Sequence, residues 1–208
     1  MSRGKDMENA SDVEYWSWES CCTKIRGLKG RLGFEDSDNL RFLKLSLSLK
    51  DGSISDELII GRKLHPYEIK GIYCILYGYA GSNPVQETSE LISFRKIPGG
   101  WFYHKPFTYR VLKSIERTFG SDPSLLIRAG ELLGGSEAEY GDYSVRIYSL
   151  PLIPLTVVLW AETEEFPASA NILYDSSITN YLSTEQIVML SELTALRLRH
   201  AIEVIKRG

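Results

Sequence analysis

The clearest pattern in the chain is an alternation of leucine with polar residues between positions 43 and 49. Leucines occupy the odd positions and lysine or serine the even ones, which is typical of a strand with one face in water. Asp51-Gly52 follows, and this dipeptide favours a two-residue turn because glycine adopts positive φ without strain. The pattern therefore predicts a β-hairpin over residues 41–60.

The register of this hairpin contains one conflict. Pairing outward from the turn places Leu49 opposite Ile54, and it places Leu47 opposite Asp56. A carboxylate on the apolar face of a hairpin is costly to bury. Asp56 therefore predicts a bulge, or a strand end at which its side chain reaches water.

A second group of strands is predicted between residues 143 and 175. Alternating apolar residues begin at Tyr143, and Pro151 interrupts them before an apolar run over residues 152–160. An acidic turn, AETEEFP, separates that run from a further strand over residues 168–175. Because short connections join antiparallel neighbours, we expect an antiparallel meander over 143–175.

Apolar residues at steps of three and four predict the helices. The predicted helices cover residues 12–28, 66–80, 107–119, 123–133 and 183–205. The last begins at Ser183, which forms a capping-box pattern with Gln186. Apolar residues occupy most of its circumference, so we expect this long C-terminal helix to lie across a sheet or to be shared with a second subunit. His200 is expected at the surface.

Strands and helices alternate along the chain without a regular βαβ rhythm. This order favours an α+β fold with a mostly antiparallel sheet, built from the 41–60 hairpin and the 143–175 meander and covered by helices. We expect a single domain over residues 12–208, because a chain of this length buries a sizeable core. The polar residues 1–11 are expected to form a disordered tail.

The composition is that of an ordinary soluble protein. The chain is 43% hydrophobic and 25% charged, with a formal net charge of −3, so general nucleic-acid binding is disfavoured. The N-terminus lacks the apolar core of a signal peptide, and no apolar run is long enough to span a bilayer. We therefore expect a cytoplasmic protein with no membrane segment.

Cysteine and histidine offer little for a metal site. Cys21, Cys22 and Cys74 have no C-x-x-C spacing, which favours a reduced protein with buried thiols. A site in which one of the adjacent cysteines meets Cys74 in space is the alternative. The chain has only 3 histidines, so a multi-histidine metal site is not expected. The sequence identifies no cofactor.

Carboxylates gather in the acidic turn, at Glu164 and Glu165, and Asp175 ends the strand that follows. Strand residues rise about 3.3 Å each, so roughly 20 Å separates the turn from Asp175. Paired-carboxylate catalysis requires separations below about 10 Å, and the spacing therefore argues against one catalytic site. Asp175 also has a structural interpretation, because it precedes Ser176-Ser177 and can accept backbone N–H bonds in a turn.

Arg95 is a lone cation between a predicted strand and the turn Pro98-Gly99-Gly100. Two interpretations stay open: it clamps an anion or carboxylate, or it forms an ion pair with the acidic turn. Gly99-Gly100 does not match a phosphate-binding loop, since no Lys-Ser/Thr pair follows. In the acidic turn itself, Phe166 is expected to tuck under the sheet as an anchor.

Several short motifs together resemble one family. They are Ser93-Phe94-Arg95, Pro98-Gly99-Gly100, Gly134-Gly135, Gly141-Asp142, Pro151-x-x-Pro154-Leu155 leading to Trp160, Glu164-Glu165-Phe166-Pro167-Ala168, Leu173-Tyr174-Asp175 and Tyr181-Leu182. Over roughly residues 66–200, the set is similar to the uncharacterised domain-of-unknown-function family 3786 of anaerobic archaea and bacteria. Members often lie beside, or are fused to, cysteine-rich iron–sulfur modules. The resemblance implies anaerobic redox or cofactor metabolism and, because the cysteines here lack a cluster motif, an iron–sulfur protein as partner.

We therefore predict a non-catalytic binding or accessory domain. Its candidate binding residues are Arg95, Gly99, Gly100, Trp160, Glu164, Glu165, Phe166 and Asp175. The alternative is an enzyme or small-ligand carrier in which Arg95, Asp142 and Asp175 converge near tyrosines of the 66–80 helix. A third alternative is a homodimer through the apolar C-terminal helix.

Overall fold

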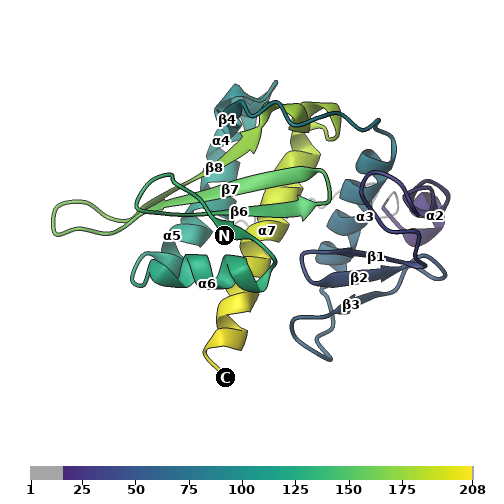
Figure 1. Cartoon of the computed structure of the whole chain (residues 1–208), viewed down its shortest axis with the longest axis horizontal. Coiled ribbons are helices and arrows are strands. Elements are labelled where there is room, and N and C mark those ends of the chain that lie inside the picture. The colour runs from purple at the N-terminus through teal and green to yellow at the C-terminus, as the bar shows by residue number, and fades with distance from the viewer. Residues whose placement is uncertain (1–15, 208) are drawn as a thin grey trace, which may run out of the picture.

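The computed structural model describes residues 16–207 and confirms the α+β class (Figure 1). Its strands form two antiparallel sheets, one of three strands and one of five, rather than the single sheet predicted. The tail predicted over residues 1–11 lies outside the described residues.

The larger sheet has the strand order β4-β8-β7-β6-β5. These strands are β4 (Leu91–Ser93), β5 (Ser136–Glu137), β6 (Tyr143–Leu150), β7 (Ile153–Trp160) and β8 (Ser169–Asp175). Strands β6, β7 and β8 confirm the predicted meander, and Trp160 pairs with Ser169 at the outer end of the β7–β8 hairpin. Every residue of β7 is buried except Trp160, because β7 lies at the centre of the sheet.

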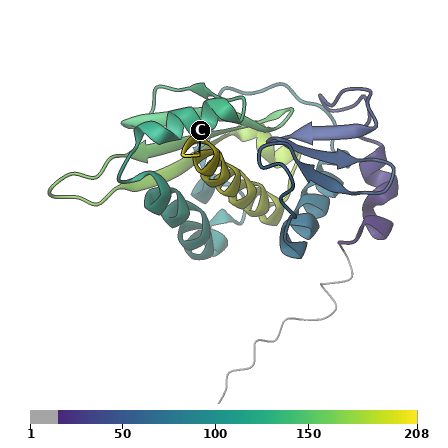
Figure 2. The same ribbon diagram turned by 90° about the horizontal axis from the view of Figure 1, so that it is seen from below.

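Helix α7 (Thr184–Ile205) runs across the larger sheet, with α3 on one side and α5 on the other (Figure 2). Ser183 and Gln186 form the predicted capping box. His200 is buried rather than exposed as predicted. The reason is that α7 also faces the smaller sheet, toward which it directs Arg197, and His200 lies beside that arginine.

The smaller sheet corrects the predicted 41–60 hairpin. It contains β1 (Asn39–Phe42), β2 (Leu45–Ser48) and β3 (Ile54–Asp56), in that order. The chain reverses at Leu43 and Lys44, whose φ values are 49° and 57°, so the predicted strand is divided into two. Ile54 pairs with Leu47 instead of Leu49, because the backbone N–H of Leu49 donates to Asp38.

Asp56 lies neither at a bulge nor in water. Its buried oxygens accept hydrogen bonds from Arg197 at 2.7 and 2.8 Å and from Arg62 Nε at 2.6 Å. Arg62 also pairs with Glu68 at 3.0 Å. Because Arg197 belongs to α7, this buried network joins the smaller sheet to the helix that crosses the larger one. The hairpin pattern alone could not show it, since Asp56 and Arg197 are 141 residues apart in the chain.

The other elements are α2 (Trp18–Arg26), α3 (Pro66–Ala80), η1 (Phe94–Lys96), α4 (Gly100–Phe107), the π-helical η2 (Thr108–Leu112), α5 (Lys113–Phe119), α6 (Ser124–Leu132) and η3 (Ser176–Asn180). The helix predicted from residue 107 begins earlier, at Gly100, because Gly99 adopts a φ of 75° and turns the chain directly into α4. Between residues 16 and 207, no helix combines the length and the apolar character needed to cross a membrane.

Candidate functional site

Two of the predicted binding residues, Arg95 and Trp160, line the same pocket. It has a volume of about 330 Å³ and lies where η1, α4 and η2 meet β7 and β8. Its lining residues are Ser93, Phe94, Arg95, His104, Phe107, Leu112, Trp160, Ala170 and Asn171. We call this the Arg95 pocket.

The Arg95 pocket combines an apolar wall with a basic rim. Phe94 and Phe107 stack with ring centroids 4.1 Å apart and planes inclined by 12°. Burial and the nearby Arg95 charge lower the pKa of His104, which favours its neutral form near neutral pH. Arg95 is therefore the charged group at the rim. The arrangement suits an apolar group that carries a carboxylate.

The pocket depends on close packing at the start of α4. Gly99 adopts the left-handed conformation, and a Cβ at Gly100 would lie 2.1 Å from the carbonyl oxygen of Phe94. The two glycines therefore let α4 begin directly against η1, which brings His104 and Phe107 next to Arg95. Neither glycine is among the residues that line the pocket, so their contribution in this structure is to position α4.

The ion pair between Arg95 and the acidic turn, one of the two interpretations left open by the sequence, is not formed among the described residues. Among residues 16–207, Arg95 makes no ion pair, and its guanidinium carbon lies 5.1 Å from the centroid of the Trp101 ring. A cation over an aromatic face is attracted by the ring quadrupole and keeps its outer edge in water. Arg95 is therefore held in place while its charge stays available.

Sequence reasoning missed the exposed aromatic residues beside Arg95. The side chains of Trp101, Phe102, Tyr103 and Tyr109 are 67%, 84%, 49% and 67% exposed. Consecutive Trp-Phe-Tyr residues were the available signal, but they preceded the predicted start of the helix. We use the name basic–aromatic face for the exposed basic and aromatic residues of the segment 95–109, which are Arg95, Lys96, Trp101, Phe102, Tyr103, Lys105 and Tyr109.

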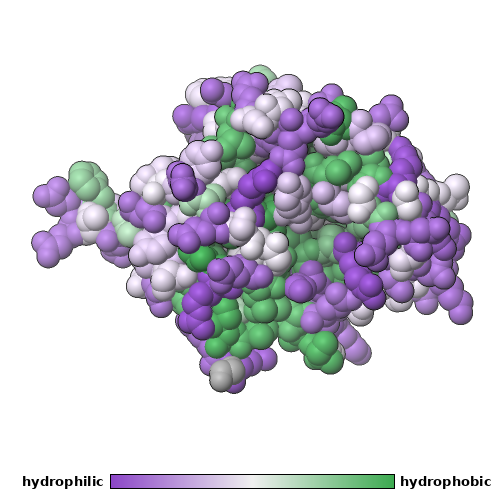
Figure 3. Space-filling view, viewed as in Figure 1, coloured by the Kyte–Doolittle hydropathy of each residue, from purple (hydrophilic) through white to green (hydrophobic). Residues whose placement is uncertain are grey.

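The loop between β7 and β8 forms an acidic arm over residues 161–168. It projects from the body of the molecule, mostly hydrophilic with a hydrophobic spot near its end (Figures 1 and 3). Its turn is closed by the Thr163 N–H, which donates to the Phe166 carbonyl at 2.9 Å. Phe166 is 67% exposed and so does not tuck under the sheet as predicted. Glu164 and Glu165 are exposed beside it.

Asp175 lies at the other end of β8, away from the Arg95 pocket. Its carboxylate accepts hydrogen bonds from Thr88, Ser89 and Ser177 at 2.7 to 3.0 Å. Burial alone would raise the pKa of Asp175, but the hydrogen bonds from Ser177 and Thr88 outweigh it and lower the pKa to about 2. These hydrogen bonds give the Asp175 carboxylate a structural role in the turn.

The alternative set of Arg95, Asp142 and Asp175 does not converge. Asp142 lies near the outer end of β7, where its Oδ2 accepts the N–H of Ala161 at 2.9 Å. Asp175 is on the opposite side of the sheet's length, about 20 Å from the Ser169 end of β8 at roughly 3.3 Å per residue. The tyrosines of α3 do not complete that site either. Of these, Tyr73 and Tyr79 are buried and donate to backbone carbonyls of the N-terminal region.

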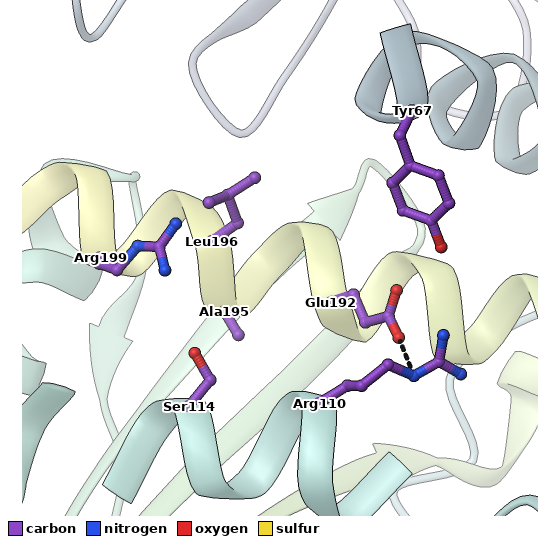
Figure 4. Close-up of a pocket in the computed structure, with 7 residues that line it drawn as sticks. All are labelled: Tyr67, Arg110, Ser114, Glu192, Ala195, Leu196 and Arg199. Carbon is purple, nitrogen blue, oxygen red and sulfur yellow. Dashed lines mark ion pairs between the residues drawn. The ribbon is translucent and has the colours of Figure 1, made fainter. Parts of the chain in front are cut away.

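A second pocket, of about 410 Å³, lies between α3, α7 and the η2–α5 segment (Figure 4). Its lining residues are Tyr67, Arg110, Ser114, Glu192, Ala195, Leu196 and Arg199. Glu192 pairs with Arg110 at 3.0 Å. Burial raises the pKa of Glu192, although Arg110 opposes the effect. The predicted polar strip of the C-terminal helix thus faces a shallow pocket in which its glutamate is already paired.

The cysteines and carboxylates form no recognisable metal centre. Within the described part of the chain, no group of three or more His, Cys, Asp or Glu side chains is placed to hold a metal ion. Cys21 and Cys74 are buried free thiols, and Cys22 is partly exposed. Burial raises the pKa of Cys74 to about 11, so this thiol stays protonated and unreactive near neutral pH.

Comparison with known proteins identifies a family to which no function is assigned. No curated protein and no solved structure matches the chain. The sequence profile described as a domain of unknown function, DUF3786, matches residues 30–197. That range includes every strand of both sheets, the Arg95 pocket, the acidic arm and most of α7. Because the match covers most of the chain, this protein belongs to the DUF3786 family.

Proposed function

We propose that this protein is a non-catalytic binding domain that recognises an acidic, aromatic segment of a protein partner at the Arg95 pocket. The observation that carries the proposal is an apolar pocket with, at its rim, an arginine that pairs with no carboxylate of residues 16–207. An aromatic side chain entering the pocket would contact the Phe94–Phe107 stack. A carboxylate next to that ring would meet Arg95.

The basic–aromatic face supports the same function. Tryptophan, tyrosine and arginine are the residues most enriched among those that dominate binding energy in protein interfaces. Trp101 and Tyr109 are both 67% exposed, although such rings normally cover apolar surface. Exposed aromatic rings in the segment that supplies the pocket's arginine favour a partner with apolar contacts and negative charge.

A second part of the proposal concerns the cellular role of this binding domain. We propose an accessory function in the redox or cofactor metabolism of anaerobes, in the cytoplasm, with an iron–sulfur protein as one partner. The family resemblance supports this role, and the scattered cysteines of this chain leave any cluster to the partner. The small-ligand alternative around Arg95, Asp142 and Asp175 is weaker, because Asp142 and Asp175 lie at opposite ends of the β7–β8 hairpin and the Asp175 carboxylate is occupied by a turn.

A peptide titration tests the binding function. The probe is a synthetic peptide with one phenylalanine flanked by glutamates, and its binding is followed by tryptophan fluorescence and calorimetry. We expect Arg95→Glu to weaken the affinity about tenfold or more, because it places like charges together. Trp160→Ala is expected to weaken it by removing part of the apolar wall.

Arg128→Glu is the matched control, since Arg128 is an exposed arginine on α6, away from the pocket lining. It makes the same change of net charge as Arg95→Glu. If the wild-type protein does not bind the peptide, or if the two variants lose affinity equally, the proposed recognition is wrong.

A further inference from the structure

We propose that the acidic arm of a second copy of this chain occupies the Arg95 pocket, so that two molecules exchange arms in a symmetric dimer. This inference rests on the proposed function and names the occupant of the same pocket. It differs from a dimer through the C-terminal helix, which buries much of its surface within its own chain.

The arm carries the chemical groups that suit the pocket. Phe166 is exposed at the arm's turn, and Glu165 precedes it in the chain. Among residues 16–207, neither Glu164 nor Glu165 makes an ion pair, and Arg95 makes none either. A projecting aromatic ring with adjacent carboxylates and an apolar pocket with a free arginine are therefore complementary in both hydrophobicity and charge.

The arm cannot reach the pocket of its own chain without breaking its hairpin. At its base, Trp160 and Ser169 are held together by the strand pairing of β7 and β8. Ala168 lies close over Gly120, where an added Cβ would come within 2.9 Å. The arm points away from the body of the molecule (Figure 1). The pocket that the arm occupies must therefore belong to another molecule.

The position of the pocket favours a reciprocal contact. Trp160 and Ala170 flank the base of the arm and also line the pocket. The pocket thus lies one arm length from the tip, about 16 Å at roughly 3.3 Å per residue. When two such arms lie side by side in opposite directions, each tip meets the base of the other. One two-fold axis satisfies both contacts, which closes the assembly at two copies.

The basic–aromatic face extends this contact beyond a single side chain. Lys96 and Lys105 are exposed and next in sequence to the pocket residues Arg95 and His104, so they add positive charge for the glutamates of the arriving arm. Trp101 and its exposed neighbours offer apolar surface around the docked ring. Because the attraction is partly between exposed charges, added salt should weaken the dimer.

A charge-swap experiment on the full chain tests the proposal. One variant is Arg95→Glu, and the other is the double variant Glu164→Lys with Glu165→Lys. Each variant alone brings like charges together in both arm contacts and should be a monomer. Their equimolar mixture restores opposite charges in both contacts and should form a heterodimer. Sedimentation velocity and light scattering measure the masses.

Two further variants separate arm docking from nonspecific association. Phe166→Ala should weaken the wild-type dimer by about tenfold or more, because the ring is the central apolar contact. Ile60→Ala removes a side chain that is 84% exposed outside the pocket lining and should leave the dimer unchanged. Circular dichroism of each variant establishes that it is folded.

A wild-type protein that stays monomeric up to about 1 mM overturns the arm exchange. So does a dimer that survives both charge variants, or a mixture that does not associate. If the chain is monomeric but still binds the acidic peptide through Arg95, only the self-recognition fails and the proposed binding function stands. If neither association is seen, both fail.

Discussion

Asp175 is a buried carboxylate whose hydrogen-bond donors all belong to two nearby turns of its own chain. Thr88 and Ser89 precede β4, and Ser177 follows Asp175 in η3. The carboxylate therefore fastens the 88–90 loop to the end of β8. The charge of Arg95 is used differently. Its guanidinium lies over the Trp101 ring and has no acidic partner among the described residues.

The depressed pKa of Asp175 predicts a loss of stability in acid. The folded pKa of about 2 lies below the unfolded value of about 3.9. Its stabilisation is therefore present above about pH 4 and is lost as the pH falls toward about 2. Asp175→Asn removes a charged acceptor and should lower the free energy of unfolding near pH 7 by about 1–3 kcal/mol.

Urea denaturation at a series of pH values measures this effect. The variant should also lose part of the slope of stability against pH below about pH 4. Asp36→Asn is the control, because the Asp36 side chain is 83% exposed. An unchanged acid slope in the Asp175 variant would contradict the role assigned to its carboxylate.

Element α4 shows how a backbone requirement creates a binding site. Gly99 supplies a left-handed residue, and Gly100 supplies space for the Phe94 carbonyl. Pro106 then lies inside the helix, which ends at Phe107, and Thr108–Leu112 form the π-helical η2. π-Helical segments are frequent near functional sites, and this one carries Tyr109 of the basic–aromatic face.

Gly100→Ala is predicted to displace α4 from η1. The added Cβ would lie 2.1 Å from a backbone oxygen, which cannot move as a side-chain tip can. We expect a loss of about 1–3 kcal/mol in the free energy of unfolding, together with weaker peptide binding at the Arg95 pocket. Thermal unfolding and the peptide titration provide the two measurements.

Gly71→Ala in α3 is the matched substitution. A Cβ there meets nothing within 4 Å, and the residue lies inside a helix. Alanine should therefore stabilise the protein by about 0.4–1 kcal/mol. If the two alanine variants behave alike, the close approach of Gly100 to Phe94 is not what holds α4 in place.

At the scale of the whole molecule, a buried ion pair joins the two sheets. Arg197 of α7 donates to Asp56 of β3 through Nη1 and Nη2, and it also donates to the carbonyls of Leu43 and Lys44. Neither Arg197 nor the Asp56 side chain is exposed to solvent. The family match, over residues 30–197, contains both partners. Buried hydrogen bonds therefore tie the smaller sheet to α7.

Breaking this pair is predicted to be costly. Asp56→Asn leaves the buried charge of Arg197 without a carboxylate and should lower the free energy of unfolding by about 3–5 kcal/mol. Glu57→Gln removes the neighbouring pair with Arg41, which is exposed, and should cost at most about 1 kcal/mol. Urea denaturation of both variants gives the comparison, and similar losses would refute the connecting role of Asp56.

Local patterns predicted the elements that depend on neighbours in sequence. The β7–β8 hairpin, the start of α3 at Pro66 and the Ser183 capping box were predictable, because turns and caps use residues only a few positions apart. The number of residues in β8 also predicted that the acidic turn and Asp175 lie far apart. The division of the first hairpin was not predictable, because leucine and lysine rarely adopt positive φ.

The sequence by itself determined the α+β class, the β6–β7–β8 meander, the long C-terminal helix, and the two chemically different ends of the β7–β8 hairpin. Only the tertiary structure decided that Asp56 meets Arg197, that Arg95 shares a pocket with Trp160, and that Phe166 projects into solvent. The physical reason is distance along the chain. Local periodicity selects the conformation of a segment, whereas pockets and buried ion pairs arise where packing brings distant segments together.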